Sequence, residues 1–336
     1  MSAFIEALKK RILVLDGAMG TMLQQYQFTE EDFRGKRFKD FHKPLKGNND
    51  LLSITQPEAI AEIHRKYFNA GADIVETNTF SGTTVAMADY DMEDLVYELN
   101  FESAKIAKEV AAELTKNEPD KPRFVAGAMG PTNKTASLSP DVNDPGFRAI
   151  SFDELRIAYK QQAEALVDGG VDILLVETIF DTLNAKAALF AIEELKEERN
   201  LDIPVMVSGT ITDASGRTLS GQTAEAFLIS ISHIPLVSVG FNCALGAKQL
   251  TPHLEVIANR TEIAVSAYPN AGLPNAFGEY DESPAQMALQ IEEYLDKKLI
   301  NIIGGCCGTT PPHIEAIAEL AAKYEPRPLE LNQINA

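Results

Sequence analysis

The stretch VDGGVDILLVETIF (167–180) places a glycine stop and an aspartate before a continuous apolar run that ends in Glu-Thr. The stretch FNAGADIVETNTF (68–80) repeats the same order earlier in the chain. Glycine suits the end of a helix, where a left-handed backbone is favoured, and a continuous apolar run is typical of a parallel strand buried on both faces. Each stretch therefore predicts a helix that leads into a buried strand, and the repetition indicates equivalent units of one array.

Outward from this unit, short apolar runs alternate with longer helix-like segments along the chain. The predicted strands are ILVLD (12–16), ADIVETN (72–78), RFVAGAM (123–129), DILLVET (172–178), PVMVSGT (204–210), LVSVGFN (236–242), EIAVSAY (262–268) and INIIGG (300–305). Eight strands, each followed by a helix or loop, predict an α/β protein with the (β/α)8 TIM-barrel fold. A doubly wound open sheet is the alternative, but DGAMGT after the first strand lacks the spacing of a dinucleotide-binding loop.

The chain has 336 residues, 45% of them hydrophobic, which supplies enough apolar surface for one large barrel or two smaller domains. We expect one barrel over residues 1–325. The Pro-containing sequence EPRPLELNQINA follows the last helix-like segment, so residues 326–336 are predicted to be a tail or the start of a linker. Long loops over 24–56 and 130–150 follow the first and third strands, on the side where barrel enzymes bind substrates.

The formal net charge of −19 argues against a nucleic-acid partner, because phosphate neutralisation needs clustered Lys and Arg. No stretch approaches the roughly 18 apolar residues that cross a bilayer. The first residues, MSAFIEALKKR, predict an amphipathic helix without the apolar core of a signal peptide. Three cysteines, two of them adjacent, do not suggest a disulfide framework. We therefore expect a cytoplasmic protein without a membrane partner.

Polar or metal-binding groups occupy nearly every predicted strand end, and in a barrel these ends meet at one rim. In chain order they are Asp16, Glu76, Gly127, Glu177, Ser208, Asn242-Cys243, Tyr268-Pro269-Asn270 and Cys306-Cys307. The opposite ends of the strands are ordinarily apolar. This asymmetry predicts a functional site at the carboxyl-terminal rim.

The only cysteines of the chain are Cys243, Cys306 and Cys307, and they follow the sixth and eighth predicted strands among glycines. Three thiolates leave one position of a tetrahedral zinc site open, as a catalytic zinc requires. Three buried free cysteines are the bland alternative, and a closed structural site would need a fourth ligand that no histidine near the rim supplies. A soft three-sulfur site with one vacancy best fits zinc that awaits a substrate thiol.

Asp16 and Glu177 end the first and fourth strands and could hold a substrate ammonium by charge-assisted hydrogen bonds. A rim salt bridge or a helix cap is the alternative for either residue. The loop Gly17-Ala18-Met19-Gly20-Thr21 leads into a helix, so the amide groups of this loop could bind a substrate carboxylate. Ser208, at the end of the fifth strand, completes the predicted substrate contacts. An amino acid with a side-chain thiol would satisfy all these features.

At this point the motifs resemble a known family. GFNCALG, GGCCGTTPPHI, LDGAMGTML and GADIVETNTF are similar to the homocysteine S-methyltransferase family. The longer stretches KGNNDLLSITQPEAI, GAMGPTNKTASLSPDVNDPGFRAISFDEL, SGTITDASGRTLSGQT and YPNAGLPNAFGEYDESP resemble the homocysteine-binding module of its cobalamin-dependent methionine synthase branch. The resemblance runs from about residue 10 to 325.

The resemblance implies zinc held by Cys243, Cys306 and Cys307, with the sulfur of L-homocysteine as the fourth ligand. It also implies that Asp16 and Glu177 bind the amino group. In that branch the methyl donor is methylcobalamin, which is recharged from 5-methyltetrahydrofolate, and L-methionine is the product. No corrinoid motif of the DxHxxG type occurs in the chain. The cobalamin-binding and methyltetrahydrofolate-binding modules would therefore be partners, in cis if the chain is a fragment and in trans if it is a split subunit.

Two other functions stay open at this point. One is a corrinoid-independent homocysteine S-methyltransferase that takes its methyl group from S-methylmethionine or betaine at the same site. The other is a barrel without catalytic activity that binds zinc or senses thiols.

Overall fold

The computed structural model describes residues 2–213 and 215–329, and within them eight parallel strands form one ring. The strands are β1 Leu13–Val14, β2 Ile74–Glu76, β3 Phe124–Met129, β4 Ile173–Ile179, β5 Val205–Gly209, β6 Ser238–Gly246, β7 Ala264–Asn270 and β8 Ile302–Ile303. Their order is β1-β8-β7-β6-β5-β4-β3-β2. A parallel bridge between Leu15 and Ile74 joins β1 to β2 and brings the two ends of the sheet together. The predicted (β/α)8 barrel is confirmed.

Every predicted strand contains or overlaps an observed one, with differences at the ends. β1 and β8 are only two residues long, although the backbone N–H groups of Leu15 and Gly304 still donate to the carbonyl oxygens of Ile303 (2.7 Å) and Ala267 (3.0 Å) on neighbouring strands. β6 continues to Gly246, past the predicted end at 242, and thereby includes Cys243 within the sheet.

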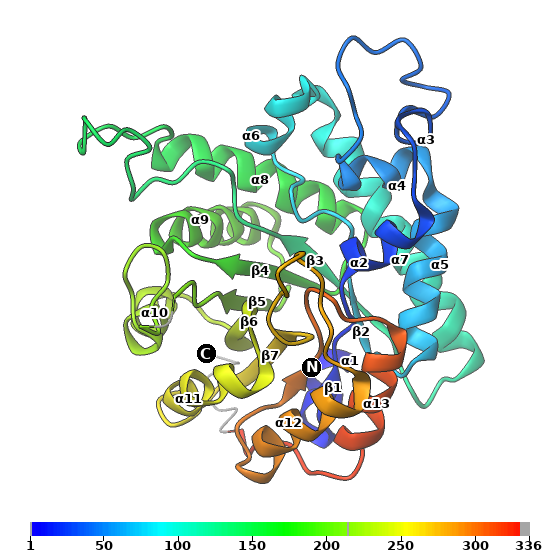
Figure 1. The fold of residues 1–336 in the computed structure, drawn as a ribbon, viewed down its shortest axis with the longest axis vertical. Coiled ribbons are helices and arrows are strands. Elements are labelled where there is room, and N and C mark those ends of the chain that lie inside the picture. Colours follow the sequence, from blue (N-terminus) through cyan, green and yellow to red (C-terminus); the bar gives the residue numbers. More distant parts are fainter. Residues whose placement is uncertain (1, 214, 330–336) are drawn as a thin grey trace.

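Helices surround the sheet in chain order (Figure 1). The ring consists of α5 Pro57–Asn69, α7 Val96–Asn117, α8 Phe152–Asp168, α9 Thr182–Arg199, α10 Ala224–Ile231, α11 Ala247–Ala258, α12 Pro284–Asp296 and α13 Pro311–Ala321. Local sequence explains their starts. Ser151 and Glu154 form a capping box at the start of α8, and Pro57 stands at the first position of α5, where a missing N–H costs nothing.

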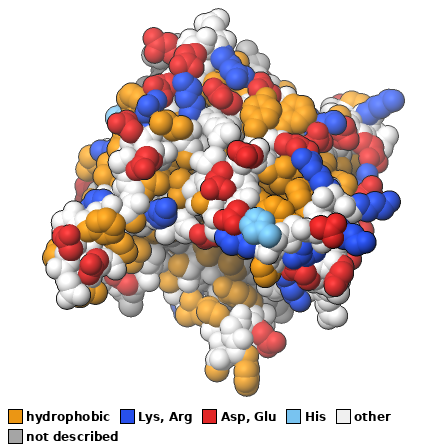
Figure 2. Space-filling view, turned by 90° about the horizontal axis from the view of Figure 1, so that it is seen from above, with side chains coloured by type: hydrophobic (Ala, Val, Ile, Leu, Met, Phe, Trp, Pro, Cys, Tyr) orange, Lys and Arg blue, Asp and Glu red, His pale blue; other side chains and the backbone are white. Residues whose placement is uncertain are grey.

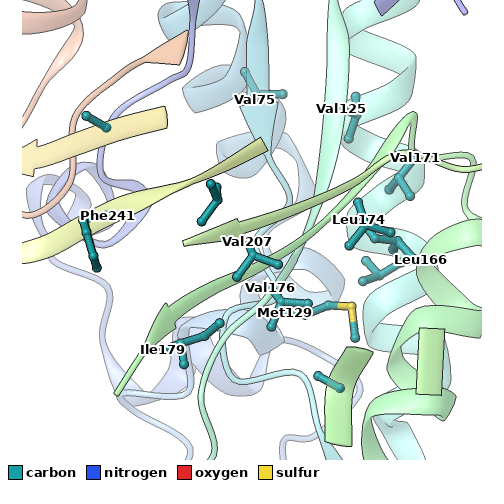
Figure 3. Packing of buried hydrophobic residues seen from close by; sticks show 14 of the residues in the cluster. Val75, Val125, Met129, Leu166, Val171, Leu174, Val176, Ile179, Val207 and Phe241 are labelled. Atoms are coloured by element: carbon teal, nitrogen blue, oxygen red, sulfur yellow. The ribbon is translucent and has the colours of Figure 1, made fainter. Parts of the chain in front are cut away.

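Two apolar layers hold the barrel together. The larger layer lies between the strands and the helices, and Figure 3 shows part of it, with Val125 and Leu174 of the sheet near Leu166 of α8. The smaller layer fills the barrel interior, where Leu15, Ile74 and Met206 belong to one buried cluster. Burying apolar side chains on both faces of a parallel sheet is the main stabilisation of such a fold.

The predicted amphipathic helix at the start of the chain is α1, Ala3–Lys10, and it closes the end of the barrel at which the strands begin. Phe4 and Leu8 belong to the interior cluster. The ring of Phe4 meets that of Phe124, the first residue of β3, edge to face at 5.4 Å between centroids. The rim at the other end of the strands is therefore the open end of the barrel.

The two long loops differ from each other. The segment 24–56, predicted to be irregular, contains several short helices: the end of α2 (Met19–Tyr26), then α3 Glu30–Arg34, η1 Asn49–Leu51 and α4 Leu52–Thr55. Segment 130–150 has no helix or strand, as predicted, and a part of it projects away from the ring beside α8 (Figure 1). The remaining short helices lie between β2 and α7 and are α6 Thr84–Met87, η2 Ala88–Tyr90 and η3 Glu93–Leu95.

The last described residues pack against the closed end of the barrel. The Arg327 guanidinium donates hydrogen bonds to the carbonyl oxygens of Ala258 (2.9 Å), Thr261 and Ile263 (3.1 Å). The rest of the predicted tail, residues 330–336, lies outside the described residues, so the domain boundary at 325 stays a prediction. Among the described helices, none is long and apolar enough to cross a membrane. Figure 2 shows one face of the molecule, on which acidic, basic and hydrophobic side chains are interspersed.

Candidate metal and substrate site

The three cysteines come together at the open end of the barrel. Cys243 lies within β6, while Cys306 and Cys307 follow β8 after Gly304 and Gly305. The three sulfur atoms lie within 4.8 Å of one another, and Sγ of Cys243 is 3.7 Å from Sγ of Cys307. Zinc–thiolate bonds of about 2.3 Å in tetrahedral geometry place neighbouring sulfurs about 3.8 Å apart. Among the described residues this is the only group of three or more His, Cys, Asp or Glu side chains able to hold a metal, and its geometry and soft donors fit zinc.

Irregular backbone brings Cys243 out of the regular ladder. The pairing of β6 with β7 shifts register between Asn242 and Gly246. Within this bulge Cys243 and Ala244 have φ of 59° and 56°, a left-handed conformation that non-glycine residues adopt reluctantly. Earlier in the strand, a Cβ on Gly240 would lie only 1.7 Å from the backbone oxygen of Ser266, so only glycine fits there.

Neighbouring strand ends fix the turn that carries the other two cysteines. The Cys306 amide donates to the carbonyl oxygen of Pro269 (2.8 Å), and the Cys307 amide donates to Oδ1 of Asn270 (3.1 Å). The amide of Gly308, the next residue, donates to the Thr21 hydroxyl at 3.0 Å. Thr21, predicted as a substrate contact, thus supports the cysteine turn from α2.

The thiols interact strongly with one another. Hydrogen bonds from the Cys243 and Cys306 thiols hold the pKa of Cys307 well below its usual range. The same sharing with Cys243 and Cys307 raises the pKa of Cys306. Three adjacent thiolates cannot all carry charge without a cation, because like charges at this distance repel. The cluster is therefore chemically suited to a divalent metal, which would stabilise all three thiolates together.

Three carboxyl groups lie at the same rim. Asp16 and Glu177 are 3% and 4% exposed, and Glu76 at the end of β2 has a buried Oε1 without a hydrogen-bond partner. Oδ2 of Asp16 accepts the Glu76 amide N–H at 3.2 Å. Burial raises the pKa of all three groups, that of Glu177 to about 8; repulsion by Glu177 further raises the pKa of Asp16 and Glu76, and repulsion by Asp16 adds to the effect on Glu76. In the described part of the chain, none of the three forms an ion pair.

A buried carboxylate without a cation is costly, so such a group suits a cationic ligand. A primary ammonium offers three N–H donors, and Asp16, Glu76 and Glu177 offer acceptors from three different strands. Glu76, which the repeated sequence idiom alone did not distinguish from a framework residue, thus lies with the two predicted acids. Its position at the end of a strand was the available signal.

The remaining predicted contacts lie nearby. Gly20 is in the first turn of α2, where the cap residue Ala18 provides no side-chain hydrogen bond, and a Cβ on Gly20 would face open space. Ser208 is fully buried, and its hydroxyl donates to Oδ1 of Asn242 at 2.7 Å. Tyr268, 1% exposed, belongs to the interior cluster against which Cys306 packs, and its hydroxyl has no partner. Sequence reasoning noted Asn242 and Tyr268 only as strand ends.

Comparison with known proteins shows the family of the chain. The family model described as homocysteine S-methyltransferase matches residues 13–321. The crystal structure of the homocysteine methyltransferase MmuM from Escherichia coli in its metallated form is 25% identical, with a TM-score of 0.71, and the match covers 94% of this chain and 98% of that chain. The oxidised form of that protein gives 24% identity, a TM-score of 0.72 and coverage of 95% and 99%, which shows the shared fold. A methyltransferase activity follows from the family match, which spans almost the whole barrel: the chain belongs to the homocysteine S-methyltransferase family.

Proposed function

We propose that this barrel transfers a methyl group to the thiol of L-homocysteine and releases L-methionine. The observation that carries the proposal is the cluster of Cys243, Cys306 and Cys307, with sulfurs within 4.8 Å of one another, at the same rim as the buried carboxyls of Asp16 and Glu177 and the partly buried carboxyl of Glu76, which have no cationic partner among the described residues. A soft metal site and a cation site side by side match the two ends of an amino acid that carries a thiol. Zinc is the metal that fits the three sulfurs.

Each group of the site has a defined task in this proposal. Bound zinc supplies one chemical effect, which is to lower the pKa of the substrate thiol so that the sulfur remains a nucleophilic thiolate near neutral pH. Asp16 and Glu177 accept hydrogen bonds from the substrate ammonium and thereby orient its side chain toward the cysteines. The first-turn amides of α2, near Gly20 and Thr21, receive the carboxylate. The Ser208 hydroxyl donates to Asn242, so its oxygen can still accept a hydrogen bond. Ser208 therefore stays a predicted substrate contact.

The methyl donor divides the proposal into two versions. The comparisons favour a small free donor such as S-methylmethionine or betaine, because a solved homocysteine methyltransferase is matched over 98% of its own chain by this single barrel. The version with methylcobalamin, together with cobalamin-binding and methyltetrahydrofolate-binding modules as partners, is supported by the resemblance of the longer sequence stretches only. We therefore place the corrinoid-independent donor first.

A donor panel tests both versions. The zinc-loaded protein is incubated with homocysteine and S-methylmethionine, betaine or methylcobalamin, each carrying a deuterated methyl group, and labelled methionine is measured by mass spectrometry. Transfer from the sulfonium or betaine without corrinoid supports the first version. Transfer from methylcobalamin alone reverses the order of the two.

The cobalt-substituted protein tests the alternative without catalysis. A catalytic site with an open position changes its sulfur-to-cobalt absorption when homocysteine adds a fourth sulfur. An unchanged spectrum, together with no transfer from any donor, would replace the enzyme proposal by a structural metal site. A changed spectrum without transfer would favour a thiol sensor.

A further inference from the structure

Asn242 links the sulfur side of the rim to its carboxylate side. The residue is fully buried and precedes Cys243 in β6. Its Oδ1 accepts the backbone N–H of Thr178 at 3.1 Å and the Ser208 hydroxyl at 2.7 Å. Its Nδ2 donates to the Thr178 hydroxyl at 2.7 Å and approaches Sγ of Cys306 at 3.9 Å. A backbone N–H can only donate, so the orientation of the amide is fixed, with the NH2 group toward Cys306.

The bonds of Asn242 hold a backbone conformation that Thr178 would not adopt alone. Thr178 has φ of 52°, which is a true outlier for a β-branched residue. It lies where the pairing of β4 with β5 shifts register between Val176 and Ile179. Strained residues of this kind persist only where their surroundings determine them, and they cluster at functional sites. Both the amide and the hydroxyl of Thr178 are bound by the Asn242 side chain.

Thr178 in turn contacts the acid beside it. Its hydroxyl lies 3.3 Å from Oε2 of Glu177. A continuous path of hydrogen bonds therefore runs from the Cys306 sulfur through the Asn242 amide and Thr178 to the Glu177 carboxyl. The path has few degrees of freedom, because both ends of one planar amide are engaged and Asn242 and Glu177 are buried, although Thr178 and Cys306 are partly exposed.

We propose that Asn242 is a positioning residue that couples metal binding at the cysteines to ammonium binding at Glu177. This inference rests on the proposed function in that Glu177 receives the ammonium of the substrate. A metal-bound Cys306 is a thiolate, which accepts a stronger hydrogen bond than a thiol does. The stronger bond fixes the Asn242 amide and with it Thr178 and Glu177. Metal binding thereby prepares the carboxyl site, and by thermodynamic linkage an amino acid at that site strengthens metal binding by the same factor.

The test uses L-norleucine, which carries the ammonium, the carboxylate and a straight side chain but has no sulfur to bind the metal. Its affinity is measured by calorimetry on the protein with and without zinc, for the wild type and for Asn242→Ala. In the wild type, zinc is expected to tighten norleucine binding several-fold. In Asn242→Ala the ratio of the two affinities falls toward one, and zinc affinity, measured against a chromophoric chelator, drops about 10- to 100-fold.

Asn100→Ala is the matched control. Asn100 of α7 is also fully buried, and its Nδ2 donates to the carbonyl oxygens of Gly82 and Val96, both at 2.7 Å, away from the cysteines. This variant is expected to lose thermal stability but to keep the zinc affinity and the zinc-dependent ratio of the wild type. A merely structural role for Asn242 would give the same result in Asn242→Ala.

Thr178→Gly keeps the inference testable if Asn242→Ala does not fold, because glycine adopts positive φ without strain. It removes the hydroxyl between Asn242 and Glu177, so the zinc-dependent ratio falls while zinc affinity stays near the wild-type value. A wild-type ratio of one, or an unchanged ratio in both variants, would overturn the coupling. No binding of norleucine to the wild type in either state would overturn the ammonium assignment of Glu177 and the coupling with it. Absence of methyl transfer, with the ratio intact, would overturn the proposed function alone.

Discussion

The sulfur side and the carboxylate side of the rim are built in opposite ways. The cysteines are partly exposed and lie in a bulge and a turn, with Cys243 in a left-handed conformation. Asp16 and Glu177 are almost fully buried. The sulfur side can therefore accept a ligand from solvent. On the carboxylate side the carboxyls are shielded from water, so their ionisation is unfavourable unless a cation binds to them.

This difference suggests a division of tasks in the proposed function, with reaction chemistry on the sulfur side and substrate binding on the carboxylate side. In the proposed function, the sulfur side supplies the chemistry of the reacting atom, so a change there should remove activity altogether. The carboxylate side supplies orientation and affinity, so a change there should weaken homocysteine binding and leave the metal in place. Four predictions can break or sharpen this division.

The largest effect is expected for Cys306→Ala. Two thiolates cannot replace three as a zinc site, so metal retention and methyl transfer should both be lost. Zinc content is measured by atomic emission after dialysis, and turnover with the donor identified by the panel. Full activity in this variant, with methylcobalamin or any other donor, would contradict the metal assignment.

Glu177→Gln should raise KM for homocysteine by about a hundredfold, because losing a buried charged partner of an ammonium costs about 3 kcal/mol. Zinc content should remain that of the wild type. Steady-state kinetics and metal analysis on the same preparation provide the measurement. Loss of zinc in this variant would show that the two sides cannot be separated in this way.

Asp50→Asn separates burial from ligand binding. Asp50 is buried in η1, its Oδ2 accepts the Ser81 amide N–H at 2.7 Å, and burial raises its pKa to about 7. The folded protein therefore keeps a proton on Asp50 that the unfolded chain loses near pH 4. The contribution of Asp50 to the free energy of unfolding is complete below about pH 4 and is lost as pH rises toward 7.

For the wild type, this residue should lower the free energy of unfolding by about 2 kcal/mol between about pH 5 and pH 7. Asn cannot titrate, so the variant should lack that loss while binding homocysteine normally. Urea unfolding across this pH range checks the difference, and parallel pH curves for the two proteins would contradict it.

The smallest effect is expected for Glu76→Gln. The amide keeps an oxygen that can accept an N–H of the substrate, so KM should rise only about fivefold, or about 1 kcal/mol. In the ligand-free protein the change removes a carboxyl whose pKa is raised by burial and by Glu177 and Asp16. Thermal stability above neutral pH should therefore increase. A KM effect as large as that of Glu177→Gln would give the two acids equal weight.

Much of this arrangement could be predicted from the sequence, because strand ends of a parallel barrel meet at one rim whatever their separation along the chain. The repeated idiom ending in Glu76 and Glu177 indicated the array, and glycines beside Cys243 indicated irregular backbone. The three cysteines then followed as one cluster. Their assembly needed only the topology, which hydrophobic periodicity specifies well.

The details that depend on backbone irregularity could not be predicted. Nothing in the letters Glu-Thr shows that Thr178 has positive φ, since Thr is among the residues least suited to it. The role of Asn242 depends on two register shifts in different strands, and periodicity does not locate bulges. Segment 24–56 has no long periodic pattern, so its short helices, which pack on the barrel, could not be predicted from the sequence.

Helix α1 closes one end of the barrel, and this closure affects the order in which substrates bind and products leave. Phe4 and Leu8 fill the end of the barrel where the strands begin, so ligands would enter at the opposite rim, where the cysteines are partly exposed and Asp16 and Glu177 are buried. A substrate whose ammonium binds at the buried carboxyls must therefore bind before a second reactant occupies the rim beside the cysteines. Homocysteine should therefore enter before the methyl donor, and methionine should leave last. By closing one end of the barrel, α1 would thus lead to an ordered sequence of substrate binding at the other end.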